Sequence, residues 1–196
     1  MKKLLLLLII FIGLAIRSVN AQSYLNLRSS YFGFGASYPL GLVATGGRYN
    51  QNGWGGTITI NPMWFSASNA PADYHGGGFS STNNISDLTL LAAIRVLKEW
   101  PTNSKYFKFG AEAGLGLVHT SIADNFRERP GWNLFASNYI FDRVKENSIG
   151  ISLRGKLEWR IGDWSGLEIG GNANFSKAKP YFGLDLMCTF GEYKKR

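Results

Sequence analysis

The stretch SIGISLRGKLEWR, residues 148–160, decides the fold. Its odd positions carry apolar side chains from Ile149 to Trp159, and its even positions carry polar or charged side chains from Ser152 to Arg160. Successive side chains of a β-strand point to opposite faces, so one face of this strand is apolar and the other is charged. The charged face is too dense for a sandwich core, and the apolar face is too continuous for a surface in water. The pattern predicts a membrane-spanning barrel strand with lipid outside and a polar interior.

The amino terminus predicts export. Lys2 and Lys3 precede an apolar core over residues 4–12, and the small-residue site Val19-Asn20-Ala21 follows. These are the three parts of a cleaved signal peptide, so we expect a signal peptide over residues 1–21 and one barrel domain over residues 22–196. An uncleaved anchor is the alternative. The apolar run is, however, shorter than the roughly 20 residues that a spanning helix needs.

Composition excludes several other classes of protein. The formal charge of +8 includes three basic residues of the leader, and the remaining basic residues alternate with apolar ones along strands. This spacing does not indicate a nucleic-acid partner, whereas attraction to anionic lipid headgroups fits it. The one cysteine, Cys188, cannot form an intramolecular disulfide, so barrel closure must hold the fold. No cofactor or metal motif appears, and we expect none.

The same alternation recurs along the chain and predicts an all-β, antiparallel up-and-down transmembrane barrel. We expect eight strands, at residues 24–37, 42–49, 54–65, 85–100, 105–120, 148–160, 167–175 and 181–193. A bulge near Ser29-Ser30 would bring the two halves of the first strand into phase. A helix competes over residues 88–100, because LLAAIRVLKEW contains good helix formers.

The lengths of the connections support this strand count. The long connections, residues 66–84 and 121–147, are the third and the fifth, whereas the second, fourth and sixth are short turns. Long external loops and short periplasmic turns are typical of outer-membrane barrels, which have both termini on the periplasmic side. The two long loops are therefore expected outside the cell.

The inward-facing side chains predict a closed lumen. An eight-stranded barrel is just wide enough for side chains to fill it, and buried charges require partners. We therefore expect a salt-bridged interior and no general pore. The predicted interior network consists of Asp87, Arg95, Glu99, Lys108, Glu112, Arg154, Lys156, Glu158, Glu168 and Asp185.

Aromatic residues on the apolar face gather near the strand ends. Amphipathic rings favour the two interfaces of a membrane, so these residues predict two aromatic belts. The predicted belts contain Trp54, Trp64, Trp100, Phe107, Trp159, Phe175, Phe182 and Phe190. A soluble lipocalin-like barrel that binds an apolar ligand is the alternative, with the apolar face inside and the charged face outside.

With its signal, its repeated alternation and its final strand, the chain resembles the small eight-stranded outer-membrane proteins: OmpX-like barrels and the related OmpA-type and OmpW-type domains. The resemblance implies a porin-like fold in the outer membrane of a Gram-negative envelope, insertion by the barrel-insertion machinery and a monomeric state. Such proteins commonly end on an aromatic residue, whereas Phe190 is here followed by residues 191–196.

Outer-membrane lipid A deacylases are also eight-stranded barrels, and they carry His-x-Ser on their membrane face. His119-Thr120-Ser121 resembles that motif, which implies Ser121 as nucleophile and His119 as base, with Asp124 or Glu128 orienting the base. The family has Asn directly after the Ser, and this chain has Ile122. A polar rim facing lipid headgroups is therefore the preferred interpretation, and we expect no enzyme.

The preferred function is structural, with surface loops that contact lipopolysaccharide or external partners. Charge-assisted hydrogen bonds to lipopolysaccharide phosphates are expected from four basic residues of the fifth connection. They are Arg127, Arg129, Arg143 and Lys145. A narrow channel for small solutes is a third hypothesis.

Overall fold

The computed structural model of the chain describes residues 30–50, 52–75, 85–102, 104, 106–131 and 137–191. The predicted signal peptide, the first part of the predicted first strand with its bulge, and residues 192–193 of the predicted last strand lie outside the described residues.

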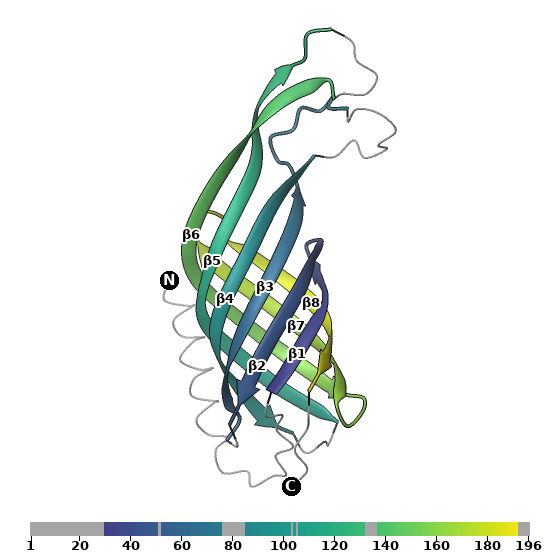
Figure 1. The fold of residues 1–196 in the computed structure, drawn as a ribbon, viewed down its shortest axis with the longest axis vertical. Coiled ribbons are helices and arrows are strands. Elements are labelled where there is room, and N and C mark those ends of the chain that lie inside the picture. Colours follow the sequence, from purple (N-terminus) through teal and green to yellow (C-terminus); the bar gives the residue numbers. More distant parts are fainter. Residues whose placement is uncertain are drawn as a thin grey trace, which may run out of the picture.

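Eight strands form one closed barrel in chain order (Figure 1). Every strand is antiparallel to the next, and β8 closes the barrel against β1. The predicted architecture is therefore confirmed. Within the described residues, no helix has the length and apolar character needed to cross a membrane. The strands are β1 (Ser30–Tyr38), β2 (Gly41–Tyr49), β3 (Trp54–Ser66), β4 (Ser86–Pro101), β5 (Phe107–Glu128), β6 (Tyr139–Arg160), β7 (Ser165–Ser176) and β8 (Tyr181–Phe190).

The two faces of each strand have the predicted orientation. On β4, Ile94 and Val96 are 69% and 59% exposed, whereas Arg95 and Leu97 are 2% and 0% exposed. Leaving large apolar side chains outside and charged ones inside is favourable only where lipid covers the outer surface. The lipocalin-like alternative, with its faces reversed, is thus wrong, and so is the alternative of a helix over residues 88–100.

The barrel has a turn end and an arm end. At the turn end, β2–β3, β4–β5 and β6–β7 are joined by short connections. At the opposite end, β5 and β6 continue far beyond their neighbours (Figure 1). β4 pairs with β5 only as far as Ser121, and β7 pairs with β6 only as far as Gly150. We call the projecting hairpin, residues 122–128 of β5 and 139–149 of β6, the arm.

The arm corrects the prediction of a loop over residues 121–147. β5 and β6 pair with each other through the arm, as far as Glu128 opposite Tyr139. The alternation rule missed these strand segments because neither face of the arm is continuously apolar. Its two faces continue the two faces of the barrel wall. We call them the lipid-side face, which includes Lys145, and the lumen-side face, which includes Glu146.

A β-bulge interrupts the pairing between Asp124 and Arg127. Asn125 within it has φ of 54°, a left-handed conformation that asparagine tolerates better than most residues. The extra residue brings Phe126 to the same side as Phe141, with their ring centroids 5.5 Å apart. The bulge therefore builds an aromatic cluster on the lipid-side face of the arm.

Candidate functional site: the barrel interior and the external arm

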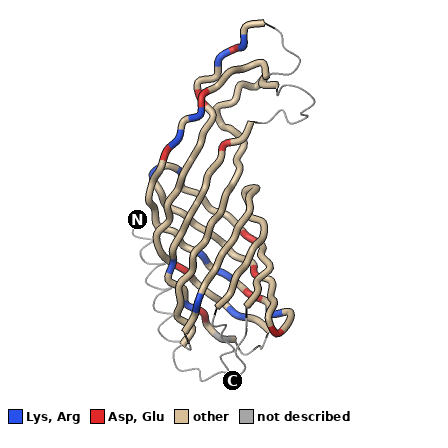
Figure 2. Tube along the Cα trace, in the orientation of Figure 1, with Lys and Arg blue, Asp and Glu red and all other residues tan. Residues whose placement is uncertain are grey.

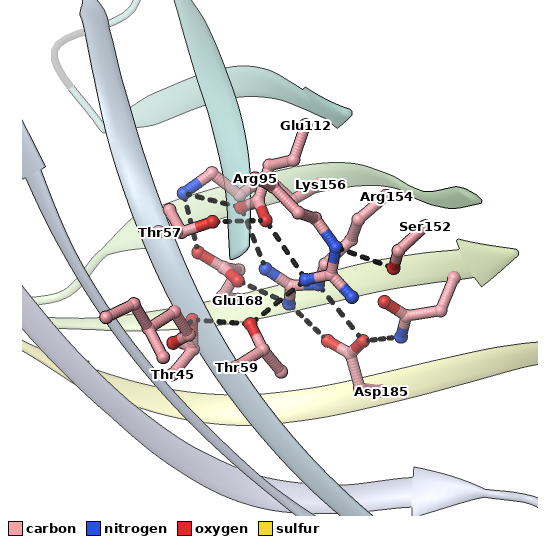
Figure 3. A network of polar contacts seen from close by, with 12 residues as sticks. Thr45, Thr57, Thr59, Arg95, Glu112, Ser152, Arg154, Lys156, Glu168 and Asp185 are labelled. Atoms are coloured by element: carbon pink, nitrogen blue, oxygen red, sulfur yellow. Dashed lines mark hydrogen bonds and ion pairs between the residues drawn. The ribbon is translucent and has the colours of Figure 1, made fainter. Parts of the chain in front are cut away.

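The barrel interior contains a charged network around Arg154 of β6 (Figure 3). Its guanidinium meets three carboxylates: Glu112 Oε1 at 3.2 Å, Glu168 Oε1 at 2.6 Å and Asp185 Oδ1 at 2.5 Å. These carboxylates come from β5, β7 and β8, and Asn172 of β7 donates to Asp185. Fully buried charges are tolerated only when they are paired and hydrogen-bonded in this way. The network therefore ties strands together from inside the barrel.

Lys156, two residues along β6, extends the network toward the turn end. Its Nζ lies 3.3 Å from both Glu99 Oε1 and Glu168 Oε2. It also donates to Tyr49 Oη at 2.8 Å and lies 4.6 Å from the ring centroid of Tyr31. The two tyrosine rings stack at 5.3 Å. Lys156 is thus held by carboxylates on one side and by aromatic rings on the other.

Arg95 of β4 joins the network from the other side of β5. Its Nη1 donates to Glu112 Oε2 at 3.3 Å and to Thr59 at 3.0 Å, and its Nε donates to Ser152 at 2.9 Å. Thr57 donates to the same Glu112 oxygen at 3.0 Å. Glu112 is therefore shared between Arg95 and Arg154, two cations from different strands.

The other predicted interior residues lie nearer the two ends. Lys108 and Glu158 are directly opposite each other in the β5–β6 register, and Glu158 accepts a hydrogen bond from Thr189. Asp87 is buried at the arm end and accepts from the backbone N–H of Ala123 at 2.9 Å. The structure thus places all ten predicted residues on the lumen side of the wall. Ion pairs join, among others, Arg95, Glu99, Glu112, Arg154, Lys156, Glu168 and Asp185.

Glycines on the inner face make room for these long side chains. A Cβ on Gly170 would lie 2.5 Å from Asp185 Oδ1 and 2.7 Å from Arg154 Nη2. A Cβ on Gly110 would lie 2.7 Å from Cε of Lys156. The network therefore depends on the absence of side chains at these positions.

Apolar side chains fill the lumen on either side of the charged layer. Toward the arm end, Met63, Leu91 and Val118 are fully buried in one cluster. Toward the turn end, Leu97 packs with Tyr31 and Tyr49 in a second cluster. The interior is thus a sequence of packed layers, the arrangement expected for an eight-stranded barrel.

Aromatic residues surround the outer wall near both ends. Phe107 and Trp159 stack at 6.2 Å at the turn end, and Phe175 meets Phe182 at 5.7 Å at the arm end. The structure places the other predicted belt residues on the same outer surface: Trp54, Trp64, Trp100 and Phe190.

A solved outer-membrane barrel has the same overall fold. The N-terminal β-barrel domain of Pseudomonas aeruginosa OprF matches with a TM-score of 0.51 at 8% identity, over 83% of this chain and 97% of that chain. The fold is that of the small eight-stranded outer-membrane barrels.

Two further solved barrels match over most of their length. The Yersinia pestis outer membrane protein Ail has a TM-score of 0.48 at 9% identity, over 84% of this chain and 99% of that chain. Neisserial surface protein A (NspA) has a TM-score of 0.45 at 14% identity, over 84% and 93%. Neither the protein-family models nor the curated protein sequences gave a match.

His119 and Ser121 lie on the lipid-side face where the arm leaves the barrel. His119 Nδ1 is 2.7 Å from Asn147 Oδ1, across the β5–β6 pair. The residue that orients the imidazole is therefore Asn147, and the prediction of Asp124 or Glu128 in that role is wrong. No hydrogen bond between His119 and Ser121 is present in the described part of the chain, so the nucleophile–base contact of a hydrolase is not formed.

The four basic residues predicted to meet lipopolysaccharide divide into two groups. Lys145 and Arg143 lie on the lipid-side face, one and two alternations beyond Asn147 respectively, and Arg143 donates to the carbonyl of Ser86 at 2.9 Å. Arg127 and Arg129 lie farther from the barrel. Arg127 pairs with Asp142 at 3.1 Å, and Arg129 donates to the carbonyl of Ser137 at 3.0 Å.

The β3–β4 connection is attached to the upper arm. Tyr74 packs against Phe126 and Tyr139, with ring centroids 6.2 and 6.5 Å apart. Tyr139 donates from its hydroxyl to Asp73 Oδ1 at 2.9 Å, and this hydrogen bond raises the pKa of the tyrosine. His75 donates its backbone N–H to Asn138 Oδ1 at 2.7 Å. The connection therefore supports the arm along one face.

Three functional features were missed from the sequence. Tyr31 and Tyr49 were not assigned to the interior network, although Tyr31 has the inward parity on β1. Trp164 was not assigned to the belts, because it lies in a turn; its ring is 5.8 Å from Phe190. The aromatic cluster of the arm gave no signal, because its members come from three separate segments.

Proposed function

We propose that this protein is an exported outer-membrane barrel with a structural and interaction role, which anchors the arm outside the cell. The arm is the observation that supports this role. A hairpin that leaves the barrel wall and has a strand edge without a neighbour is a template for binding another chain. The filled interior favours such an external role over passage of solutes.

A shortened arm tests the role. Ile122 and Val144 are cross-strand partners, so replacing residues 123–143 with Asn-Gly would close the hairpin at its base. We expect this variant to reach the outer membrane and to keep the heat-dependent gel mobility of a folded barrel. Cells that carry the shortened variant should be as permeable to dye as cells that lack the protein. Full restoration of the permeability barrier by the shortened variant would assign the role to the barrel alone.

We further propose that Arg143 and Lys145 contact phosphates of lipopolysaccharide. They follow the last apolar pair of the outer wall, Leu117 opposite Ile149, which is where headgroups meet a membrane protein. Replacing both with Gln should reduce the lipopolysaccharide retained on the purified protein. Replacing Arg127 and Arg129 is the matched control, because those residues lie farther from the barrel. Equal retention by the two double variants would contradict this assignment.

We infer that His119 and Ser121 have no catalytic role. The imidazole is bound to Asn147, and Ser121 lies opposite Lys145 in the register without contacting the imidazole. The acyl content of lipid A should be the same in cells with the native protein and with Ser121→Ala. A loss of deacylated lipid A on that substitution would instead identify a hydrolase.

A further inference from the structure

The free edge of the arm carries opposite charges on its two faces. Along β6, Arg143 and Lys145 lie on the lipid-side face, whereas Asp142 and Glu146 lie on the lumen-side face, and Val144 lies between them. Positive and negative residues alternate along the projecting hairpin in Figure 2. A strand added beside β6 would therefore meet a basic row on one face and an acidic row on the other.

Contacts within the arm support this face assignment. Arg143 lies over the ring of Phe141, 5.5 Å from its centroid, so both residues are on the lipid-side face. Arg127 is opposite Ile140 in the register and pairs with Asp142, so these residues share the lumen-side face.

Among the described residues, the β5 edge of the arm is partly covered and the β6 edge is open from Ile140 to Asn147. On β5, the backbone N–H of Ala123 is bound by Asp87. The described part of the β3–β4 connection contacts Phe126, Asn138 and Tyr139 near the outer end of the hairpin. On β6, no described strand pairs with residues 139–149 on the side away from β5. The side chains of Lys145 and Glu146 form no hydrogen bond or ion pair with any part of the chain that is described. The open edge thus presents unpaired main-chain groups and two uncompensated charges.

The charge pattern disfavours a second copy of this chain as the antiparallel partner. Antiparallel pairing of two β6 edges requires a twofold axis perpendicular to the sheet, and this operation keeps every residue on its own face. Basic residues of one copy would then stand opposite basic residues of the other, and acidic residues opposite acidic ones. Like charges directly opposite each other destabilise a strand pair.

We propose that the open β6 edge of the arm binds an extended segment of a different protein, which adds as an antiparallel strand with acidic residues on one face and basic residues on the other. This inference rests on the proposed interaction role of the arm and specifies the partner's chemistry. Main-chain hydrogen bonds supply affinity, and the alternating side chains supply specificity. Acidic side chains of the segment lie beside Arg143 and Lys145, where they replace the lipopolysaccharide phosphates proposed above, and basic side chains lie beside Asp142 and Glu146.

Two peptides of identical composition test the proposal. The first, Thr-Thr-Lys-Glu-Val-Glu-Lys-Thr-Thr, places Glu on the basic face and Lys on the acidic face when its Val is opposite Val144. The second, Thr-Thr-Glu-Lys-Val-Lys-Glu-Thr-Thr, exchanges the faces. Both cores are palindromic, so strand direction does not alter the match. Binding to the full-length protein in lipid nanodiscs is measured by fluorescence anisotropy of dye-labelled peptide.

We expect the first peptide to bind about tenfold more tightly, because its charges attract four exposed side chains that those of the second peptide repel. Lys145 and Glu146 contribute most, since Arg143 and Asp142 are also bound to Ser86 and Arg127. The double variant Lys145→Glu with Glu146→Lys should remove or reverse this preference, since each peptide then has two matched and two mismatched positions. Equal affinities for the native protein, or no binding of either peptide, would overturn the proposal. Self-association of the protein that the first peptide does not inhibit would also overturn the proposal.

The outcome separates this inference from the proposed function. If shortening the arm changes envelope permeability while the peptides bind equally, the interaction role stands and the charge rule fails. If the shortened arm restores the permeability barrier fully, the proposed function fails irrespective of the peptide result.

Discussion

Glu112 on β5 stands directly opposite Arg154 on β6, and its Oε1 lies 3.2 Å from Nη1 of that arginine. Its other carboxylate oxygen lies 3.3 Å from Nη1 of Arg95 on β4. One carboxylate thus connects three consecutive strands within the lumen, where no solvent compensates for its loss.

Replacing Glu112 with Gln should lower the free energy of unfolding by about 3 kcal/mol, because Arg95 and Arg154 each lose a buried counter-charge. Urea unfolding in lipid vesicles, followed by tryptophan fluorescence, measures this loss. Arg127→Gln is the control. It breaks the pair with Asp142, whose side chains are 67% and 53% exposed, and should cost less than about 1 kcal/mol. Similar losses for the two variants would show that burial does not determine the strength of these ion pairs.

Gly170→Ala should destabilise the barrel by about 1–3 kcal/mol, because the new methyl group overlaps the Arg154–Asp185 pair. Gly155→Ala provides a matched comparison: it lies on the outer face of β6, and a Cβ there meets nothing within 4 Å. The temperature at which each variant loses its folded gel mobility should drop for Gly170→Ala and remain near the native value for Gly155→Ala. A reversed order would contradict the interior packing.

The contact between Tyr139 and Asp73 should weaken at alkaline pH. The hydrogen bond raises the pKa of Tyr139, so its contribution is fully present below the ordinary tyrosine pKa and is lost as pH rises through the raised value. NMR of ring-labelled tyrosine should show Tyr139 titrating later than an unperturbed tyrosine, and Asp73→Asn should bring the titration earlier. Tyr139→Phe, which removes the signal, identifies the resonance. An unchanged titration in Asp73→Asn would contradict the contact.

Purified protein in planar bilayers should show no porin-like conductance, because Met63, Leu91 and Leu97 fill the lumen on both sides of the charged layer. Conductance steps should be measured across a range of voltages, with a general porin inserted under the same conditions as the positive control. Steps comparable to those of the porin would show that the packed layers do not seal the barrel.

Residues 148–160 predict the barrel well because lipid and lumen impose opposite polarity on alternate side chains. This rule also determines which residues face the interior. It cannot identify their partners, because Glu112 contacts Arg95 and Arg154 through the register of three strands, and register depends on the whole closed wall.

The arm follows a different rule, which explains the failed prediction there. Beyond Ser121 and Ile149 both faces of the β5–β6 hairpin are mixed, so alternation of apolar and polar residues disappears while the hydrogen-bonded ladder continues. The bulge at Asn125 and the contacts with Tyr74 are long-range outcomes of that ladder. Sequence periodicity contains no information about them.

β5 and β6 run without a break from the charged layer to the outer end of the arm, and this continuity determines how the arm transmits force. The outer end of the arm, at Glu128 and Tyr139, is joined to the membrane-embedded wall by two continuous strands, with no loop between arm and wall. A partner that pulls on this outer end along the strand direction would load both strands along their backbones. The ladders that join them to β4 and β7 would then be loaded in shear, many hydrogen bonds together instead of one by one. Force applied to the arm would therefore reach the layer containing Glu112 and Arg154 without first unfolding a linker.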